Sequence, residues 1–384
     1  MRLLSRISFP LFPGAVLSDH GARAGRFPAA ETARYFFFGY KGAISMMILV
    51  HSAESEYEII LRNGALKDVG WLLPLDRRIL IVTDDGVPPE YAAGVAAAAA
   101  HPTLVTLPHG EGSKTLENYQ TLLKTMLSAG FTRGDAVVAV GGGMVGDLAG
   151  FTAATYMRGV DFFNIPTTLL AQVDSSIGGK TAVNLAGTKN SVGCFYAPSR
   201  VLIDPDTLKT LSFRDKKSGF AEIIKMAATS DAALFSLLEN TDDPDAILPE
   251  LIRRALLIKK QVVERDPKET GLRMVLNFGH TVGHAIESAA GGSLSHGECV
   301  ALGMLPMCSP AVRSRIKALL SKFELPLTAP FSASVLSAYL QSDKKRAGDR
   351  ISAVLVDEIG SFTFRKLLPE EILTRAERTG ILRP

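Results

Sequence analysis

The stretch DAVVAVGGGMVGDLAGFTAAT, residues 135–155, decides the fold of the N-terminal half of this chain. Its apolar, β-branched run Ala136–Val140 predicts a buried parallel strand. Glycines 141–143 follow, and Leu148–Tyr156 then provides helix formers. A strand, a glycine turn and a helix bring backbone N–H groups up to a phosphate. Because the spacing is not G-x-G-x-x-G, a nucleotide loop and a tight strand-to-helix turn both remain open.

Polar residues crowd into the segment that follows. Between residues 158 and 190 stand Arg158, Asp174, Lys180, Asn184, Lys189 and Asn190, among several glycines. Glycine-rich segments that carry lysines and asparagines indicate an anion-binding site. A solvated surface loop is the alternative interpretation.

Three long motifs in this region resemble the 3-dehydroquinate synthase family. They are GGGMVGDLAGFTAATYMRG (141–159), IPTTLLAQVDSSIGGKTAVN (165–184) and KNSVGCFYAPSRVLID (189–204). The resemblance extends from about Met47 to about Arg375. It implies an N-terminal α/β dinucleotide-binding domain followed by a mainly α-helical domain for metal and substrate, and it implies a homodimer.

The composition limits the classes of function. The chain has 384 residues, of which 47% are hydrophobic and 21% charged, as in ordinary globular proteins. A net charge of +3 does not favour nucleic acid or a membrane surface, and we see no apolar run of the roughly 18 residues that a membrane span needs. Cys194, Cys299 and Cys308 show no C-x-x-C spacing. We therefore expect a reducing compartment, the cytoplasm.

We expect three regions along the chain. Residues 1–45 form an extension that we expect to lie outside the fold; two interpretations are an Arg- and Ser-rich transit peptide and a translation start at Met46 or Met47. Residues 46–212 form the NAD-binding domain, and residues 213–384 form the mainly helical domain. The composition changes after Leu211, where helical patterns begin to dominate.

Local patterns predict the individual elements. The strands expected in the first domain, besides Ala136–Val140, are Tyr57–Leu61, Arg78–Thr83, Phe162–Ile165 and Val201–Ile203. The expected helices are Ala92–Ala100, Thr115–Ala129, Ser218–Met226, Leu251–Glu264, Val282–Ala290 and Glu298–Met307. Ser113 is a candidate cap for the helix from Thr115. The segment ISAVLVDEIGSFTFRK near the C-terminus predicts a hairpin.

The resemblance implies a bound NAD. The residues that it places against the cofactor are Asp84, Glu111, Lys114, Gly142, Gly143, Asp147, Thr167, Thr168, Asp174, Lys180, Lys189 and Thr210. Asp84 ends a predicted strand, where open α/β sheets hold ribose hydroxyls. The family usually has an asparagine at the position of Gly86, so this chain departs from the pattern at one expected cofactor contact.

Three histidines close together suggest a metal site. His280 and His284 are spaced i, i+4 on one helix face, and His296 follows soon after. Spacing alone pairs His280 with His284, and each histidine by itself also fits an ordinary core or surface position. The resemblance instead implies zinc or cobalt held by Glu222, His280 and His296, with His284 facing the substrate.

The resemblance also implies a sugar-phosphate substrate. The expected substrate-binding residues are Arg158, Lys180, Asn190, Lys259, Arg273, Asn277, His284, Lys344 and Lys345. Arg158 is expected to reach the phosphate site of a neighbouring subunit, while a solvated lysine-rich helix face is the alternative for the lysines. Relatives whose substrates lack a carboxylate tend to lose the residues that match Lys259, Arg273 and Asn277. A carboxylate is costly to bury without a charged partner, so their presence favours a carboxylated substrate.

The implied reaction converts 3-deoxy-D-arabino-heptulosonate 7-phosphate to 3-dehydroquinate and phosphate in the shikimate pathway. NAD+ oxidises the C4 hydroxyl, phosphate leaves by β-elimination, NADH returns the hydride, and an internal aldol reaction closes the ring. Asp174, Lys180, Lys225 and His284 are the expected catalytic residues. The alternatives are a sugar-phosphate cyclase of secondary metabolism, a metal-dependent polyol dehydrogenase, and a non-catalytic binding protein.

Overall fold

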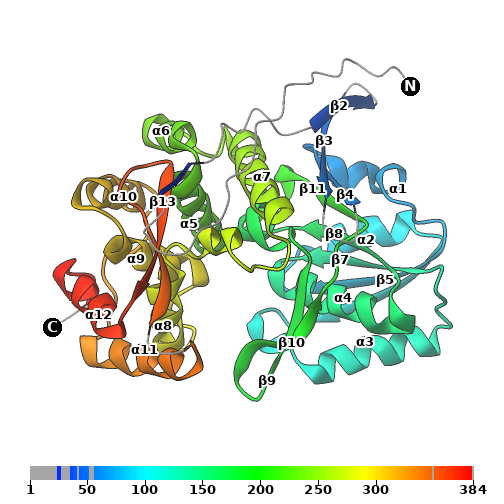
Figure 1. Ribbon diagram of the computed structural model, residues 1–384. Helices are drawn as coiled ribbons and strands as arrows, with labels where there is room; N and C mark the ends of the chain where they lie inside the picture. Colours follow the sequence, from blue (N-terminus) through cyan, green and yellow to red (C-terminus); the bar gives the residue numbers. More distant parts are fainter. Residues whose placement is uncertain (1–23, 27–34, 41–42, 52–55, 348–349, 383–384) are drawn as a thin grey trace. The chain divides into compact units, whose positions relative to one another are not determined.

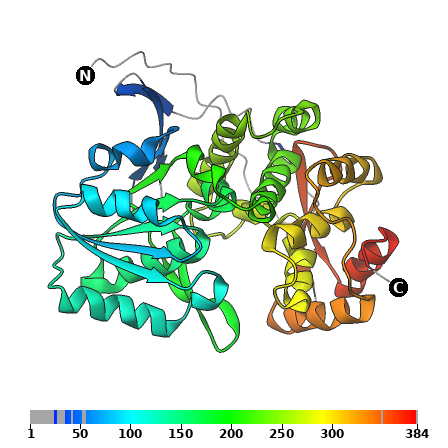
Figure 2. The same cartoon turned by 180° about the vertical axis from the view of Figure 1, so that it is seen from behind.

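The computed structural model describes residues 24–26, 35–40, 43–51, 56–347 and 350–382. The chain divides into two compact units: the described residues from 35 to 212 form the first, and residues 24–26 together with those from 213 onward form the second (Figures 1 and 2). Each unit has its own sheet and helices.

The first unit is built on a sheet of eight strands in the order β2-β3-β4-β11-β8-β7-β5-β6. The bounds are β2 Tyr35–Tyr40, β3 Ala43–His51, β4 Glu56–Leu61, β5 Arg78–Asp84, β6 His101–Leu107, β7 Ala136–Gly141, β8 Asp161–Pro166 and β11 Arg200–Ile203. The six strands from β4 to β6 in this order run parallel, whereas β2, β3 and β4 pair antiparallel. All six residues of β7 are buried, as its apolar run predicts.

Helices cover both faces of this sheet. Alternate residues of β5 and β7, such as Leu80 and Val137, join a core with α3 (Leu116–Ser128) and α4 (Gly143–Thr155). Their neighbours, such as Ile81 and Val138, join a second core with α1 (Val69–Leu72) and α2 (Pro89–Ala98). This is the α/β arrangement that the glycine motif predicts. The helix after the glycine turn begins earlier than Leu148, at Gly143, so the turn itself forms the helix N-terminus.

Two details differ from the sequence-based expectations. Thr115, not Ser113, caps α3 by accepting from the Asn118 N–H, while the Ser113 hydroxyl donates to the Pro108 carbonyl at 2.6 Å. The polar segment after residue 179 forms an antiparallel hairpin of β9 (Lys180–Leu185) and β10 (Thr188–Phe195). Its two-residue turn is Ala186-Gly187, both with positive φ, the twist that favours tight hairpins.

The segment before Met46 contributes to both units. β2 pairs with β3 along its whole length, and β1 (Ala24–Arg26) pairs antiparallel with the C-terminal strand β13. We expected residues 1–45 to lie outside the fold, and at these two strands the structure differs from that expectation because their main chains are hydrogen-bonded into sheets. The remainder of this segment up to residue 34 lies outside the described residues.

The second unit is mainly helical. Its helices are α5 Phe213–Ser230, α6 Ala232–Asn240, α7 Leu248–Arg265, α8 His280–Ala290, α9 His296–Met304, α10 Pro310–Lys322, α11 Ala333–Ala347 and α12 Pro369–Arg378. The four helices expected here are present, although α9 ends at Met304 and continues as the 3-10 turn Leu305–Met307. The expected hairpin is β12 (Ile351–Leu355) with β13 (Ser361–Leu367). Among the described residues, no helix is both long and apolar enough to cross a membrane.

Candidate active site

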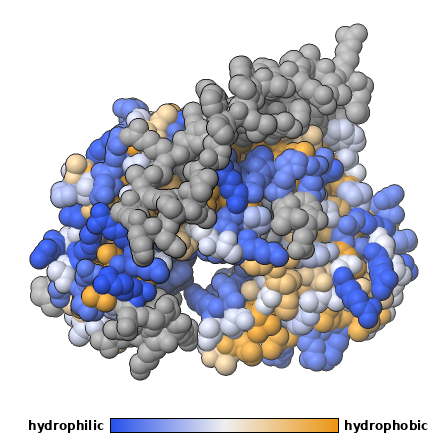
Figure 3. Space-filling view, viewed as in Figure 1, coloured by the Kyte–Doolittle hydropathy of each residue, from blue (hydrophilic) through white to orange (hydrophobic). Residues whose placement is uncertain are grey.

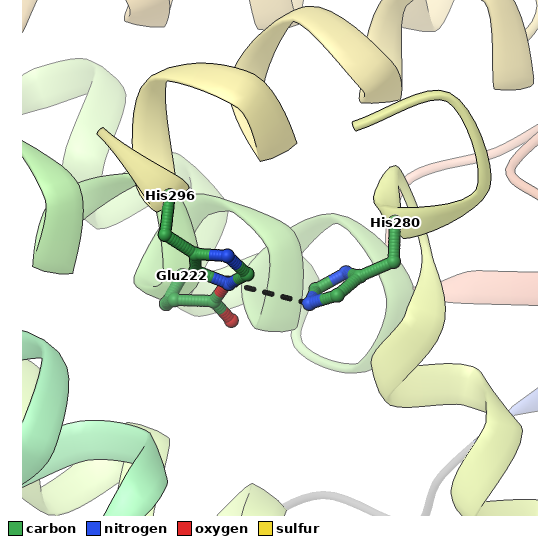
Figure 4. A group of neighbouring side chains, drawn as sticks. All are labelled: Glu222, His280 and His296. Carbon is green, nitrogen blue, oxygen red and sulfur yellow. Dashed lines mark ion pairs between the residues drawn. The ribbon is translucent and has the colours of Figure 1, made fainter. Parts of the chain in front are cut away.

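Three helices of the second unit bring a carboxylate and two imidazoles together (Figure 4). Glu222 lies in the middle of α5 and is fully buried, while His280 and His296 are the first residues of α8 and α9. The Nε2 atoms of His280 and His296 lie 3.9 Å and 3.6 Å from Glu222 Oε1. Three donor atoms this close are suited to a single divalent cation.

Glycines allow these helices to approach so closely. A Cβ on Gly297, next to His296, would lie 2.4 Å from the Cα of Ser218 on α5. A Cβ on Gly303 would lie 1.9 Å from the carbonyl oxygen of Gly279, next to His280. Real side chains do not fit at such distances, so glycine at both positions sets the spacing between the elements that carry the histidines.

The local capping of α9 orients His296. The Ser295 side chain accepts from the Glu298 N–H, and the Glu298 carboxylate accepts from the Ser295 N–H at 2.7 Å, which completes a capping box. The backbone of His296 is therefore held at a defined helix start. His280 begins α8 directly after Gly279, whose φ of 81° is left-handed.

Burial and neighbouring charges shift the pKa values of all three groups. Burial lowers the pKa of His280 to about 3, and the Lys225 ammonium adds to that shift. Burial alone would lower the pKa of His296, but the carboxylates of Glu222 and Glu287 raise it to about 9. Burial would raise the pKa of Glu222, yet Lys225 and the two histidines hold it well below its usual range. Glu222 is thus ionised and His280 neutral, the states that bind a metal, whereas His296 carries a proton at neutral pH that metal binding would displace.

These residues fit a metal ion. Neither carboxylate oxygen of Glu222 has a hydrogen-bond partner among the described residues, although the ammonium of Lys225 forms an ion pair with Oε2. A buried carboxylate without hydrogen bonds is costly unless a cation compensates it. Two imidazoles and a carboxylate also leave coordination positions open for substrate oxygens.

The histidine pair expected from spacing alone, His280 and His284, has a different geometry. The His284 side chain is exposed, with its ring centroid 5.1 Å from that of His280. His284 belongs to a second group of possible ligands, with Glu287 and His296. The pairing of His280 with His284 from spacing alone therefore misses the buried carboxylate, which lies far away in the sequence.

The expected anion-binding residues of the second unit lie on several elements. Lys259 on α7 is buried, and Arg273 and Asn277 belong to the 3-10 helix η7, Leu272–Asn277. The guanidinium of Arg273 donates to the Pro267 carbonyl at 2.8 Å, and Asn277 donates to Glu269 at 3.2 Å. Lys344 and Lys345 belong to α11, but their side chains lie outside the described part of the structure.

A buried lysine organises the polar residues of the first unit. The ammonium of Lys114 is paired with Asp147 and donates to the side chain of Asn190. Glu111 Oε1 lies 4.0 Å from the same ammonium and accepts from Asn184 at 2.9 Å. Four residues that the resemblance groups at the cofactor and substrate, Glu111, Lys114, Asp147 and Asn190, are therefore neighbours. Asn184, which the sequence indicates only as a member of the polar segment, links Glu111 and Asn190.

The glycine turn fits a dinucleotide. A Cβ on Gly142 would lie 3.1 Å from Thr168 Cγ2, and a Cβ on Gly143 would lie 2.9 Å from Ser175 Oγ. Glycine at both positions therefore lets the start of α4 pack directly against Thr168 and Ser175, and a helix N-terminus of this kind favours a phosphate. The buried Ser175 hydroxyl has no partner among the described residues. Sequence reasoning missed Ser175, although it directly follows Asp174 in the motif.

The other expected cofactor and substrate residues are spread along the first unit. Asp84 ends β5, and its Oδ1 accepts from the Gly86 N–H at 2.9 Å. Thr167 follows β8, and its N–H donates to the Gly141 carbonyl at 2.9 Å. The rest of the set are Asp174 on the π-helical turn Ala171–Ser175, Lys180 at the start of β9, Lys189 on β10, exposed Arg158, and Thr210, whose hydroxyl lies 2.9 Å from that of Tyr91.

Comparison with known proteins covers both units. A family model described as 3-dehydroquinate synthase N-terminal matches residues 104–218, and one described as 3-dehydroquinate synthase C-terminal matches residues 219–346. The chain is 42% identical over 339 residues to a 3-dehydroquinate synthase of Latilactobacillus sakei, covering 83% of this chain and 95% of the relative. It is 43% identical over 356 residues to that of Enterococcus faecalis OG1RF, covering 87% and 99%.

Solved structures with the same fold include two sugar-phosphate cyclases. A 2-deoxy-scyllo-inosose synthase, complexed with carbaglucose-6-phosphate, NAD+ and Co2+, matches with a TM-score of 0.78 at 26% identity, over 86% of this chain and 99% of that chain. A 2-epi-5-epi-valiolone synthase from Streptomyces hygroscopicus, with NAD+ and Zn2+ bound, matches with a TM-score of 0.76 at 30% identity, over 85% and 99%. A probable glycerol dehydrogenase of Sinorhizobium meliloti, at 14% identity and a TM-score of 0.53, shares the fold alone.

Proposed function

Because the chain belongs to the 3-dehydroquinate synthase family, we propose that it converts 3-deoxy-D-arabino-heptulosonate 7-phosphate to 3-dehydroquinate and phosphate. The observation that carries this proposal is the 42–43% identity to relatives of that name over 95–99% of their lengths. The buried group of Glu222, His280 and His296 supports it, since two related cyclases bind NAD+ together with Co2+ or Zn2+.

We assign NAD to the unit of residues 46–212, and the metal and most of the substrate to the unit of residues 213–384. When bound, NAD supplies a reversible hydride acceptor, and zinc or cobalt supplies a Lewis acid for substrate hydroxyls. Glu222, His280 and His296 hold the metal in this assignment. The start of α4 receives the pyrophosphate in this assignment, and the ion pair with Lys114 fixes the position of Asp147 on α4.

The cationic residues bind the two anionic ends of the substrate. Lys259 and Arg273 are suited to the carboxylate, because a buried carboxylate requires charged partners. Asn277 and His284 are suited to the phosphate end. Fixing both ends aligns the carbon atoms that react, which is the main way in which binding groups accelerate a reaction.

Four residues act nearer the reacting atoms in this proposal. Asp174 orients or relays a proton near the nicotinamide, while Lys180 and Lys225 stabilise negative charge that develops on the substrate. His284 donates a hydrogen bond to the departing phosphate. The π-helical turn that carries Asp174 is a geometry that often occurs at functional positions.

We further propose a cytoplasmic homodimer. Apolar residues gather on part of the first unit's surface in Figure 3, and exposed apolar side chains of this unit include Met157, Leu185 and Phe195. Exposed apolar patches are typical of protein interfaces. Met157 precedes Arg158, the residue proposed to reach the partner's phosphate site. The three cysteines are free, which suits a reducing compartment.

A second candidate is a cyclase of secondary metabolism that uses a sugar phosphate without a carboxylate. The two cyclase structures described above favour it, since they cover 85–86% of this chain. Their identities of 26% and 30% are lower than the 42–43% to the synthases. Lys259 and Arg273 also argue for a carboxylated substrate. The polyol dehydrogenase alternative rests on a likeness of fold alone.

Phosphate release tests the proposal. The protein is incubated with 3-deoxy-D-arabino-heptulosonate 7-phosphate and substoichiometric NAD+, with and without a chelator, beside sedoheptulose 7-phosphate. Release from the first sugar only, sensitive to the chelator and without net NADH, is the expected result. Release from the second sugar only would assign the chain to the cyclases of secondary metabolism.

A further inference from the structure

The imidazole of His296 is contacted from both sides. Its Nε2 lies 3.6 Å from Glu222 Oε1, and its Nδ1 lies 3.3 Å from Oε2 of Glu287. Glu287 belongs to α8, the same helix that begins with His280. One helix therefore supplies both a metal-ligand candidate and a carboxylate that faces the other nitrogen of the second imidazole.

We propose that Glu287 is a positioning residue that orients His296 for metal binding. When a metal binds, Nε2 would have to release its proton, and the hydrogen bond from Nδ1–H to the Glu287 carboxylate would keep the remaining proton on Nδ1 and leave the Nε2 lone pair facing the side of Glu222. The same hydrogen bond fixes the ring rotation and increases the basicity of Nε2. Glu287 thus raises the affinity of the group for a metal without touching it. This inference rests on the proposed metal-dependent function.

His280 has an equivalent partner on its other nitrogen. Its Nδ1 lies 3.3 Å from the carbonyl oxygen of Phe278, while its Nε2 faces Glu222. Both imidazoles therefore present Nε2 to the carboxylate and have an acceptor at Nδ1. The partner of His280 is main chain and cannot be removed by substitution, but that of His296 is a side chain.

An alternative role for Glu287 is that of a ligand, because Glu287, His284 and His296 also have donor atoms within 4.8 Å of one another. Two observations favour the positioning role. Glu287 Oε2 is already at hydrogen-bond distance from His296, whereas both oxygens of Glu222 are buried without a hydrogen bond among the described residues. The His284 side chain is also exposed. The Lys225 ammonium pairs with Glu222 Oε2, while Oε1 faces both imidazoles, so Oε1 is the oxygen suited to a metal.

Cobalt titration of the full-length chain tests this inference. The purified protein is stripped with a chelator, and Co2+ binding is followed by its visible absorption in the wild type, Glu287→Ala, Glu287→Gln and Glu250→Gln. Glu250 is a partly exposed glutamate on α7 that pairs with Arg253 and serves as the matched control. Circular dichroism verifies that each variant is folded.

We expect one Co2+ per chain in every variant. Glu287→Ala should weaken Co2+ binding roughly 10- to 100-fold and alter the absorption spectrum, since removing such partners typically costs that much affinity. Glu287→Gln should restore part of the affinity because its amide oxygen still accepts from Nδ1, and Glu250→Gln should match the wild type. A purely structural role would lower stability without this rescue or spectral change.

Three outcomes would overturn the inference. They are wild-type affinity and spectrum in Glu287→Ala, two Co2+ per wild-type chain with one lost in Glu287→Ala, and no Co2+ binding by the wild type at all. The proposed function can fail separately. If Co2+ binding depends on Glu287 but the chain releases no phosphate from 3-deoxy-D-arabino-heptulosonate 7-phosphate, only the proposed function is refuted.

Discussion

Individual buried charges in this chain have specific partners. Lys114 and Lys225 are almost inaccessible to solvent, and each faces a carboxylate, Asp147 and Glu222 respectively. A buried ammonium without such a partner would lose its hydration energy with no compensation. Removal of one partner is therefore expected to cost more than the net stabilisation by the pair.

Replacement of Lys114 by Met should destabilise the first unit by about 3 kcal/mol, because Asp147 would lose its cation in a poorly hydrated position. Urea denaturation measures this change, and Lys124→Met, an exposed lysine on α3, is the control. Addition of Asp147→Asn to Lys114→Met should recover part of the loss. No recovery in the double variant would contradict the role of the pair.

Replacement of His296 by Ala should reduce the metal content to less than about a tenth of the wild-type value, because two ligands bind a divalent ion far more weakly than three. Elemental analysis of the purified protein measures the content. His51→Ala changes a histidine that is 53% exposed and pairs with Glu56, and it should leave the metal in place. Full metal content in His296→Ala would show that the ligand assignment is wrong.

At the level of elements, close backbone contacts at glycines determine how nearly α5, α8 and α9 approach one another. Gly297 contacts the backbone of Ser218, and the Gly297 N–H donates to the Ser218 hydroxyl at 2.9 Å. Gly303 and Gly283 bring α8 and α9 together in the same way, because a Cβ on Gly283 would lie 3.0 Å from the Cys299 carbonyl. The metal-ligand geometry thus depends on positions that carry no functional group.

Replacement of Gly297 by Ala should lower the thermal midpoint and weaken metal binding together, because the added methyl forces α9 away from α5, at a cost of about 1–3 kcal/mol. Differential scanning calorimetry and cobalt titration measure the two effects. Gly94→Ala on α2 has open space around the added Cβ, and it should stabilise the chain by up to about 1 kcal/mol. Unchanged cobalt affinity in Gly297→Ala would mean that the helix spacing does not control the ligand geometry.

The loop before η7 should make the second unit sensitive to acid. Asp266 is buried, which alone would raise its pKa, but N–H groups of Arg273, Thr270 and Gly271 donate to it and hold the pKa below its usual value. This stabilisation is present above the unfolded-state pKa of about 3.9 and disappears as the pH falls through the lower folded value.

Asp266→Asn should therefore lower the thermal midpoint at neutral pH and flatten its decline below about pH 4. Thermal melts across this pH range test the prediction, with Asp242→Asn, an exposed aspartate, as the control. An equal decline in Asp266→Asn and the wild type would show that Asp266 is not responsible for it.

At the scale of the whole molecule, the chain combines two units that each have their own core and site residues. The single tryptophan, Trp71, lies on α1 of the first unit and is half exposed. Its fluorescence therefore reports on the unit assigned to NAD. The residues assigned to the metal all belong to the second unit.

NAD+ at about a hundredfold excess over its Kd should stabilise the first unit by about 2.7 kcal/mol. The Trp71 fluorescence transition in urea should shift accordingly, whereas a chelator should leave this transition largely unchanged. A response of the Trp71 transition to the chelator as large as its response to NAD+ would contradict the assignment of NAD and the metal to different units.

The sequence predicts the elements whose patterns are strong. The apolar runs of β4, β5, β7, β8 and β11 and the helical patterns of the second unit are present in the structure. The hairpin of β9 and β10 was missed because nearly all of β10 is exposed, so its residues show no alternation. The strand at Tyr35–Tyr40 was missed because the segment around it lacks a sustained period.

Most side-chain partnerships at the candidate sites could not be predicted from the sequence, because they join residues that are far apart in the chain or lie on different helices. The ligand candidates were found through the family motifs, whereas spacing alone paired His280 with His284. Asn184 contacts Glu111 across 73 positions, and nothing local to either residue indicates it. The partnership of Glu287 and His296 likewise depends on how α8 and α9 pack, which glycines rather than a recognisable motif determine.

The ion pair between Lys225 and Glu222 gives the protein an internal counter-ion at its proposed ligand. When the metal is absent, the Lys225 ammonium still balances the buried charge of Glu222. Loss of the metal therefore does not leave an unpaired buried charge that would favour unfolding. Preparations stripped of metal should accordingly survive storage and accept a different divalent ion on reloading. The chain is therefore well suited to metal-exchange spectroscopy, in which the same protein sample is studied with a succession of ions.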